Sequence, residues 1–553
     1  MKVLNIFRIL IALCITVIIT NSCISKADIL PAKQYSVEDF FRNPEKVDFA
    51  LSPDGKYFAY LAPYQNRLNV YVQEIGKKEA ICLTSDTARN ITWFLWGNDR
   101  RILYLKDKAG DGYMRMFGVD IDGTNLKGLT DFDQVHTEII DVLPGIDEYV
   151  IVGLNKRNPQ VPDPYRLNIN TGEMTLLAEN PGNIMGWLTD HDGKLRLAVA
   201  ITDGINTSIL FRETENKPFR NVRTNNFDEG LDPVFFKFDN KNLYAISNVG
   251  RDKRAVVEFD PYTGEEVRVI YENLDYDVNQ LNYSRAQKIL TSAGYWSWKR
   301  EWYFFDQEYE NMFRRFENEL GQMVFEVVST DRAETRRIIM ASGDKTAGSY
   351  YLHDSETGKI EKIADSKPWL DEKEMADMIP VEYTSRDGLT IHGYLTFPRG
   401  YNMNNAKNMA VVVNPHGGPW ARDIWRFSPM VQFLANRGYV VFQMNFRGSQ
   451  SYGKAFSQLS RKQWGRTMQD DITDGVNWLI GKGIADPSRI AIYGSSYGGY
   501  ATLAGITFTP DLYAAAIDFC GISNLFTYLK SFPPMWKPVL DMYYELVGDP
   551  VKD

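Results

Sequence analysis

Apolar and polar residues alternate in a unit that recurs through the first two thirds of the chain. Each unit opens on a short polar turn and continues into a β-rich run, as in SPDGKYFAYLA from Ser52 and DHDGKLRLAVA from Asp190. Seven such units begin at positions 52, 96, 144, 190, 238, 284 and 330, so they lie 44 to 48 residues apart. Several units add a second strand, polar turn and strand, which gives four strands per unit. Four strands are the content of one β-propeller blade.

The even spacing predicts a seven-bladed β-propeller over residues 45–366. A pair of all-β sandwiches is the alternative, but sandwiches would not need such regular spacing. Propellers mostly bind or scaffold, so this region alone predicts interaction and not chemistry.

After Asp365 the pattern changes to strands that alternate with helices. Continuous apolar runs near Met409 and Tyr439 are typical of buried strands, and helical spacing follows from Ser428 and from Met468. This order predicts a doubly wound, mostly parallel sheet of the α/β-hydrolase type over residues 367–553.

A G-x-S-x-G pattern lies between a predicted strand and a predicted helix of this region. It reads Gly494-Ser495-Ser496-Tyr497-Gly498, so the spacing selects Ser496 and not Ser495. In a nucleophile elbow the serine occupies a sharp strand-to-helix turn, and glycines such as Gly494 and Gly498 remove side chains where the backbones crowd. The pattern therefore predicts Ser496 as a nucleophile.

The segment HGGP, from His416 to Pro419, follows another buried strand. An α/β-hydrolase takes one oxyanion donor from the residue after the nucleophile and a second from a loop of this kind. We therefore expect the N–H groups of Tyr497 and Gly418 to form the oxyanion hole, with Gly417 as the less favoured alternative to Gly418. His416 precedes the serine, against the chain order Ser, Asp, His, so we interpret it as a residue that shapes the loop.

Composition narrows the function further. The chain has 553 residues, a net charge of -9 and a sequence pI near 5.4, which give no support to a nucleic-acid-binding surface. The sequence has no metal-ligand spacing and no phosphate-binding loop, so we expect no metal and no other cofactor.

The N-terminus predicts export. Lys2 and Arg8 precede an uncharged, mostly apolar run over residues 9–20, which suits a signal peptide better than a transmembrane anchor. We expect cleavage after Ala27, which makes residues 1–27 the signal peptide and 28–44 an N-terminal segment. Lipidation of Cys23 is the alternative, and it would provide the only membrane attachment that we expect. Either way the mature protein would be exported from a bacterial cell, to the periplasm, the outer membrane or the medium.

Several stretches together resemble the prolyl oligopeptidase family of serine peptidases. They include YSVEDFFRNPEK, LSPDGKYFAYL, YTSRDGLTIHGYL, NPHGGPWARD, NFRGSQSYGKAF and RIAIYGSSYGGYATLAG, and they cover the chain from about Tyr35 onward. The resemblance is to the acylaminoacyl-peptidase-like branch, which includes some bacterial dipeptidyl peptidases. It implies a propeller joined to an α/β-hydrolase domain, Ser496 as nucleophile, Tyr497 and Gly418 as oxyanion donors, and a propeller that restricts access to short peptides.

The sequence departs from the family pattern at one point. A catalytic triad needs an acid and then a histidine after the serine, but the five histidines all precede Ser496. The family continues with two more strands that carry these residues. We therefore expect the hydrolase domain to be C-terminally incomplete, and the chain as given to be nearly inactive.

Three functions remain open. The first is an exported serine peptidase that hydrolyses short peptides through an acyl-enzyme. The second is a non-catalytic propeller–hydrolase scaffold, which would not need the elbow or the HGGP loop. The third is an esterase on the same fold, against which the family's peptide-gating propeller argues. Oligomeric state and substrate side-chain preference are not predicted.

Overall fold

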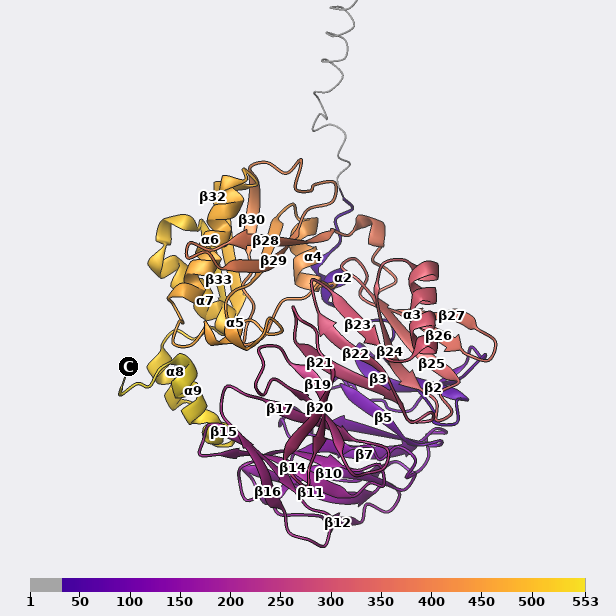
Figure 1. The fold of residues 1–553 in the computed structure, drawn as a ribbon. Helices are drawn as coiled ribbons and strands as arrows, with labels where there is room; N and C mark the ends of the chain where they lie inside the picture. The colour runs from indigo at the N-terminus through magenta and orange to yellow at the C-terminus, as the bar shows by residue number, and fades with distance from the viewer. Residues whose placement is uncertain (1–31, 553) are drawn as a thin grey trace, which may run out of the picture.

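A computed structural model describes residues 32–552, the side chains of residues 534 and 535 excepted. The predicted signal peptide, its cleavage site and Cys23 lie outside the described residues. The described chain forms a β-propeller, followed by a mixed sheet covered by helices (Figure 1).

The seven predicted blades are confirmed, and six of them have four antiparallel strands. The strands of the first three blades are β1 (Val47–Leu51), β2 (Tyr57–Tyr64), β3 (Arg67–Glu74), β4 (Ala80–Cys82), β5 (Trp93–Asn98), β6 (Arg101–Lys106), β7 (Arg115–Asp120), β8 (Lys127–Gly128), β9 (Thr137–Asp141), β10 (Tyr149–Asn158), β11 (Val161–Asn168) and β12 (Met174–Leu176). The other four blades contain β13 (Ile184–Thr189), β14 (Leu195–Thr202), β15 (Asn206–Phe211), β16 (Arg220–Asn225), β17 (Leu231–Phe236), β18 (Leu243–Ser247), β19 (Ala255–Asp260), β20 (Glu265–Tyr271), β21 (Val278–Ser284), β22 (Ile289–Trp296), β23 (Arg300–Phe304), β24 (Val324–Thr330), β25 (Arg336–Ser342), β26 (Ser349–Asp354) and β27 (Lys359–Asp365).

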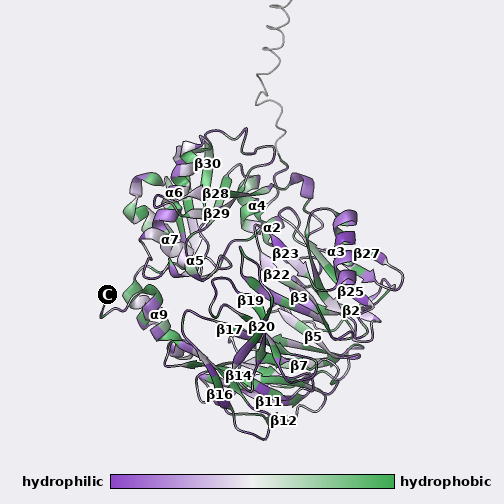
Figure 2. Ribbon diagram, in the orientation of Figure 1, coloured by the Kyte–Doolittle hydropathy of each residue, from purple (hydrophilic) through white to green (hydrophobic). Residues whose placement is uncertain are grey.

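The sixth blade corrects the expectation of four strands in every unit. It has only β21, β22 and β23, and the helix α3 (Gln307–Leu320) follows in place of a fourth strand. Asp306 caps α3 by accepting a hydrogen bond from the Tyr309 N–H, and Phe313 and Phe316 pack on the seventh blade. The rest of the helix is largely hydrophilic (Figure 2). The apolar face of the otherwise polar helix α3 thus covers apolar residues next to the sixth blade, where a fourth strand would be expected.

The ring closes between the first and seventh blades without a shared sheet. Phe49 and Phe58 of the first blade pack against Ile338 and Tyr350 of the seventh. Side chains add bonds across the joint, including one from the Leu51 N–H to Ser329 Oγ at 2.9 Å. Apolar packing therefore closes the propeller where strand pairing does not.

The second domain is a six-stranded sheet in the order β28-β29-β31-β30-β32-β33. Pairs among β30, β31, β32 and β33 are parallel, whereas β28 and β29 are antiparallel, which matches the predicted mostly parallel sheet. The elements are β28 (Met378–Thr384), β29 (Thr390–Thr396), β30 (Met409–Val413), α4 (Pro429–Asn436), β31 (Val440–Asn445), α5 (Lys454–Gln458), α6 (Thr467–Gly481), β32 (Ala485–Ser495), α7 (Tyr497–Phe508), β33 (Ala515–Phe519), α8 (Leu525–Lys530) and α9 (Leu540–Val547).

The N-terminal segment packs on the hydrolase domain. Its helix α2 (Val37–Phe41) begins at a capping box formed by Ser36 and Asp39. The buried side chain of Phe40 contacts Phe433 of α4, with ring centroids 5.9 Å apart. In the described part of the chain, no helix is long and apolar enough to cross a membrane.

Candidate active site

Ser496 lies at the turn between β32 and α7 and is exposed. Its φ of 58° and ψ of -119° lie outside the regions that L-residues favour. Two backbone bonds hold the turn, one from the Ser496 N–H to the Phe519 carbonyl oxygen at 3.0 Å and one from the Tyr500 N–H to the Ser496 carbonyl oxygen at 3.0 Å. Such strain persists only where surrounding structure enforces it, and it clusters at functional sites.

Backbone crowding explains the glycines of the motif. A Cβ on Gly494 would lie 2.1 Å from the Gly498 carbonyl oxygen, and one on Gly498 would lie 2.3 Å from the Pro415 carbonyl oxygen. Both distances are too short for any side chain. Gly494 lets α7 approach β32, and Gly498 lets α7 approach the loop that follows β30.

That approach brings the HGGP loop beside Ser496. A Cβ on Gly417 would lie 3.6 Å from Ser496 Cβ, whereas the nearest atoms to Gly418 belong to Trp420 and Ala421. Tyr497 is the first residue of α7, so its N–H has no acceptor within the helix. The loop and the helix start therefore meet at the serine, where a Cβ on Gly417, the donor that sequence reasoning favoured less, would contact Ser496. The roles of Tyr497 and Gly418 stay predictions.

His416 packs against Phe446 and forms hydrogen bonds that stabilise this loop. Its ring stacks on Phe446 with centroids 4.3 Å apart, Nδ1 donates to the Gly417 carbonyl oxygen at 2.8 Å, and Nε2 lies 2.9 Å from Ser449 Oγ. Burial lowers the pKa of His416 to about 4, so the ring is neutral at pH 7. These contacts agree with a loop-shaping role.

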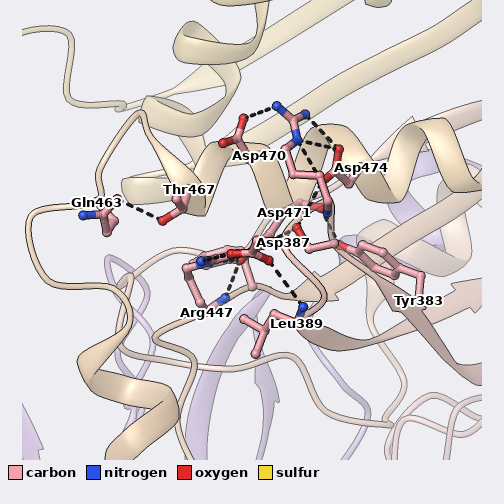
Figure 3. A network of polar contacts seen from close by, with 12 residues as sticks. Tyr383, Asp387, Leu389, Arg447, Gln463, Thr467, Asp470, Asp471 and Asp474 are labelled. Atoms are coloured by element: carbon pink, nitrogen blue, oxygen red, sulfur yellow. Dashed lines mark hydrogen bonds and ion pairs between the residues drawn. The ribbon is translucent and has the colours of Figure 1, made fainter.

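A buried ion pair that the sequence analysis missed fixes the neighbouring loop (Figure 3). Arg447 donates to both carboxylate oxygens of Asp471, at 2.7 and 2.8 Å, and forms a further pair with Asp387 at 2.8 Å. Ser385 Oγ also donates to Asp471, at 2.8 Å. Arg447 directly follows Phe446, so the pair positions the ring on which His416 stacks. The pair joins residues from separate elements, and no local motif marks it.

The described residues bring no histidine to Ser496. His136, His191 and His353 lie in the propeller, His392 pairs with Glu382 on the first hairpin of the hydrolase domain, and His416 makes the contacts given above. Asp518 Oδ1 accepts a hydrogen bond from the Gly521 N–H at 2.8 Å. Nor do the described residues contain a group of three or more His, Cys, Asp or Glu side chains that could hold a metal ion.

Two pockets are lined by residues close to the predicted oxyanion donors, Trp420 in one and Trp464 in the other. One, of about 360 Å³, lies between the domains and is lined by Asp228, Arg254 and Asp277 of the propeller and by Trp420 and Arg461 of the hydrolase domain, among others. The other, of about 380 Å³, is lined in part by Trp464, Leu525, Phe526, Leu529 and Val547. Trp464 also packs edge-on against the Tyr497 ring at 4.6 Å.

Comparison with known proteins identifies the family. The model of the prolyl oligopeptidase family matches residues 425–541. Dipeptidyl aminopeptidase BIII of Pseudoxanthomonas mexicana is 32% identical over 543 residues, which cover 96% of this chain and 78% of that protein. This chain belongs to the prolyl oligopeptidase family.

Other relatives agree with this assignment. Dipeptidyl peptidase family member 6 of Caenorhabditis elegans is 28% identical, over 95% of this chain and 75% of its own. A crystal structure of puromycin hydrolase shares the fold with a TM-score of 0.72 at 16% identity, over 94% of this chain and 84% of that one. The Pyrococcus horikoshii acylaminoacyl peptidase does so with a TM-score of 0.66 at 16% identity and the same coverage of both chains. The chain is thus a serine peptidase of the prolyl oligopeptidase family.

Proposed function

We propose that this peptidase releases dipeptides or acylated residues from short peptides, with Ser496 as the nucleophile. The strained, exposed turn of Ser496 carries the proposal, because a serine held in this backbone conformation at a helix start suits attack on a carbonyl carbon. The dipeptidyl and acylamino-acid-releasing names of several relatives support the substrate class.

In the proposed reaction, Ser496 Oγ bonds to the peptide carbonyl carbon and its proton passes to a base. Hydrogen bonds from the Tyr497 N–H and from the HGGP loop stabilise the negative oxygen of the tetrahedral intermediate. The C–N bond then breaks, the amine leaves with a proton, and water hydrolyses the acyl-enzyme. No described histidine contacts Ser496, so we place the base outside the described residues.

The scaffold and esterase alternatives have less support. A scaffold would not need a serine in strained geometry, nor two glycine positions at which any Cβ would clash. An esterase shares the elbow, so only substrate comparison separates it from a peptidase.

The test is covalent labelling of the full-length protein with a fluorophosphonate, together with hydrolysis of short peptides. Ser496→Ala should abolish both, whereas Ser495→Ala should keep labelling largely intact. Ser495 is the matched control because it is the adjacent hydroxyl, and its Oγ lies 3.6 Å from Cys520 Sγ. Full activity of Ser496→Ala would overturn the proposal, and ester hydrolysis without peptide hydrolysis would favour the esterase.

We also propose that the protein is exported, on the basis of the charged start and apolar run of residues 1–20. Mass spectrometry of the protein from its native cell should find a mature start at Asp28 or a lipidated Cys23. An intact Met1 on the mature protein would contradict both versions.

A further inference from the structure

One face of the propeller points away from the hydrolase domain, and the first hairpin turn of every blade lies there. The domain junction is made by other connections. Gly453 N–H donates to Asp277, just before β21, and Tyr394 Oη donates to the Trp298 carbonyl oxygen between β22 and β23. The first strand of each blade runs from that junction to the first hairpin turn, and several neighbouring first strands contact each other around the axis, including β1 with β24 and β13 with β17. The first turns therefore surround the far mouth of the axial channel.

Arginines from two of these turns reach across the ring. Arg285 of the sixth blade donates to the Pro144 carbonyl oxygen of the third blade at 2.5 Å, and its other terminal nitrogen lies 3.5 Å from His191 Nδ1 of the fourth. Arg332 of the seventh blade pairs with Asp147 of the third at 2.7 Å. In a ring of seven, neither the sixth nor the seventh blade neighbours the third. Both side chains therefore cross the mouth.

The turns that carry these arginines are themselves fixed. Glu334 accepts hydrogen bonds from Ser284 Oγ and from the Arg285 N–H, at 2.5 and 2.8 Å. The Arg332 N–H donates to the Pro53 carbonyl oxygen of the first blade at 2.8 Å. The two arginines thus extend from anchored turns.

Exposure along the first strands differs between blades. Met185, Asp232 and Asn279 are exposed although they lie on first strands, near the ends that face the hydrolase domain. Farther along β17 and β21, Phe236 and Ser284 are buried at the ends next to the first turns. On β24 the order is reversed, with Val324 buried at the junction end and Thr330 exposed beside the first turn. The first strands of three blades are therefore exposed at the junction end, and β24 is exposed at the far end, next to Arg332.

We propose that Arg285 and Arg332 form an axial latch that closes the far mouth, so that peptides reach Ser496 only through the domain junction. This inference rests on the proposed function for its substrate, but the closure itself does not. Such a latch limits the enzyme to peptides that pass between the domains, and it keeps folded chains and long loops from threading the propeller.

The ion pair of the latch is weak because it is exposed to solvent. The side chains of Arg332 and Asp147 are 48% and 51% exposed, and exposed ion pairs contribute little and are screened by salt. High ionic strength should therefore open the mouth without unfolding the blades.

The test uses a cysteine on a first strand of the full-length protein, close to the first turn that carries Arg332. Val328→Cys places it on β24, a first strand, at a position that is 40% exposed, with the native cysteines replaced by serine. The measurement is the ratio of its reaction rates with a bulky polyethylene-glycol maleimide and with N-ethylmaleimide. Replacing both Arg285 and Arg332 by alanine should raise this ratio several-fold, and so should high salt in the unaltered latch.

Two further variants make the outcome specific. Arg332→Asp combined with Asp147→Arg restores the pair with reversed charges, so it should return the ratio to that of the native latch. Arg337→Ala removes an arginine of the same blade that makes no cross-axis bond, so it should change nothing. Equal ratios in the native and doubly substituted proteins would overturn the latch. Fluorophosphonate labelling in the same samples reports Ser496 separately, so failure of the proposed function is not confused with failure of the latch.

Discussion

The propeller and the hydrolase domain bury their apolar residues in different ways. The hydrolase domain has one large core that includes Phe442, Met468 and Tyr497 from its sheet and helices. The propeller has several smaller clusters that lie mostly between neighbouring blades, such as the one that contains Phe211 of the fourth blade and Phe259 of the fifth. The predicted site therefore lies on a domain with one continuous core, whereas the propeller is stabilised by separate clusters between its blades.

Because of this difference, destabilising substitutions in the two domains should have different effects on the site. A change in the hydrolase core reaches the elbow, because β31 leads directly into Phe446 and the ring of His416. A substitution in a cluster between two blades should affect only those two blades, as in other repeat proteins, whose units contact only their neighbours. Equal losses of stability in the two regions should therefore affect the site unequally.

The largest expected effect comes from paired truncations, Phe442→Ala and Phe259→Ala. Both side chains are fully buried, so each variant should lower the free energy of unfolding by about 3–5 kcal/mol. Only Phe442→Ala should also slow fluorophosphonate labelling of Ser496 under native conditions. Denaturant titration and labelling rates measure the two quantities. Equal slowing by Phe259→Ala would show that the domains are not separable in this way.

A smaller effect is expected from Asp471→Asn. The carboxylate is fully buried, and its loss leaves the Arg447 guanidinium buried with only Asp387 as an acidic partner. Removing one member of a buried pair should destabilise the protein by about 3 kcal/mol. It should also slow labelling, because the loop that carries Phe446 loses its anchor.

Asp474→Asn is the matched control, three residues later on α6. The side chain of Asp474 is 12% exposed, but that of its partner Arg386 is 53% exposed, so the pair is partly solvated and its loss should cost less stability than Asp471→Asn. If both variants lose the same stability and labelling rate, the buried pair has no special role at the site.

The same contrast explains what the sequence could predict. The blades can be predicted from sequence because each hairpin turn is a local signal. The nucleophile elbow can be predicted because its strand, Ser496 and its helix are contiguous in the chain. The helix α3 was missed because the unit spacing was read as four strands throughout, although Asp306 as a cap and the spacing of Phe313 and Phe316 signal a helix. Arg447 with Asp471, and Arg332 with Asp147, join residues from different elements. Their meeting depends on the closed fold and has no sequence signature.

Asp423 provides the most specific prediction, at the junction where the two regions meet. It adjoins Arg422, which donates to the carbonyl oxygens of Trp296 and Ser297 in the propeller. Its Oδ1 accepts a hydrogen bond from Gln443 at 2.8 Å, whereas Oδ2 is buried and has no hydrogen-bond partner among the described residues.

Burial raises the pKa of Asp423 to about 7, above its ordinary value of 3.8, so the folded protein holds this proton more tightly than the unfolded chain does. Stability from this group is therefore complete below about pH 4 and is lost as pH rises toward 7. Asp423→Asn keeps an oxygen for Gln443 and never ionises. Its free energy of unfolding should match that of the native protein near pH 4 and exceed it by about 4 kcal/mol at pH 8, because the pKa of Asp423 rises from 3.8 to about 7 on folding. Denaturant titrations across this pH range measure the difference, and a difference that does not change with pH would show that Asp423 is ionised in the folded protein throughout.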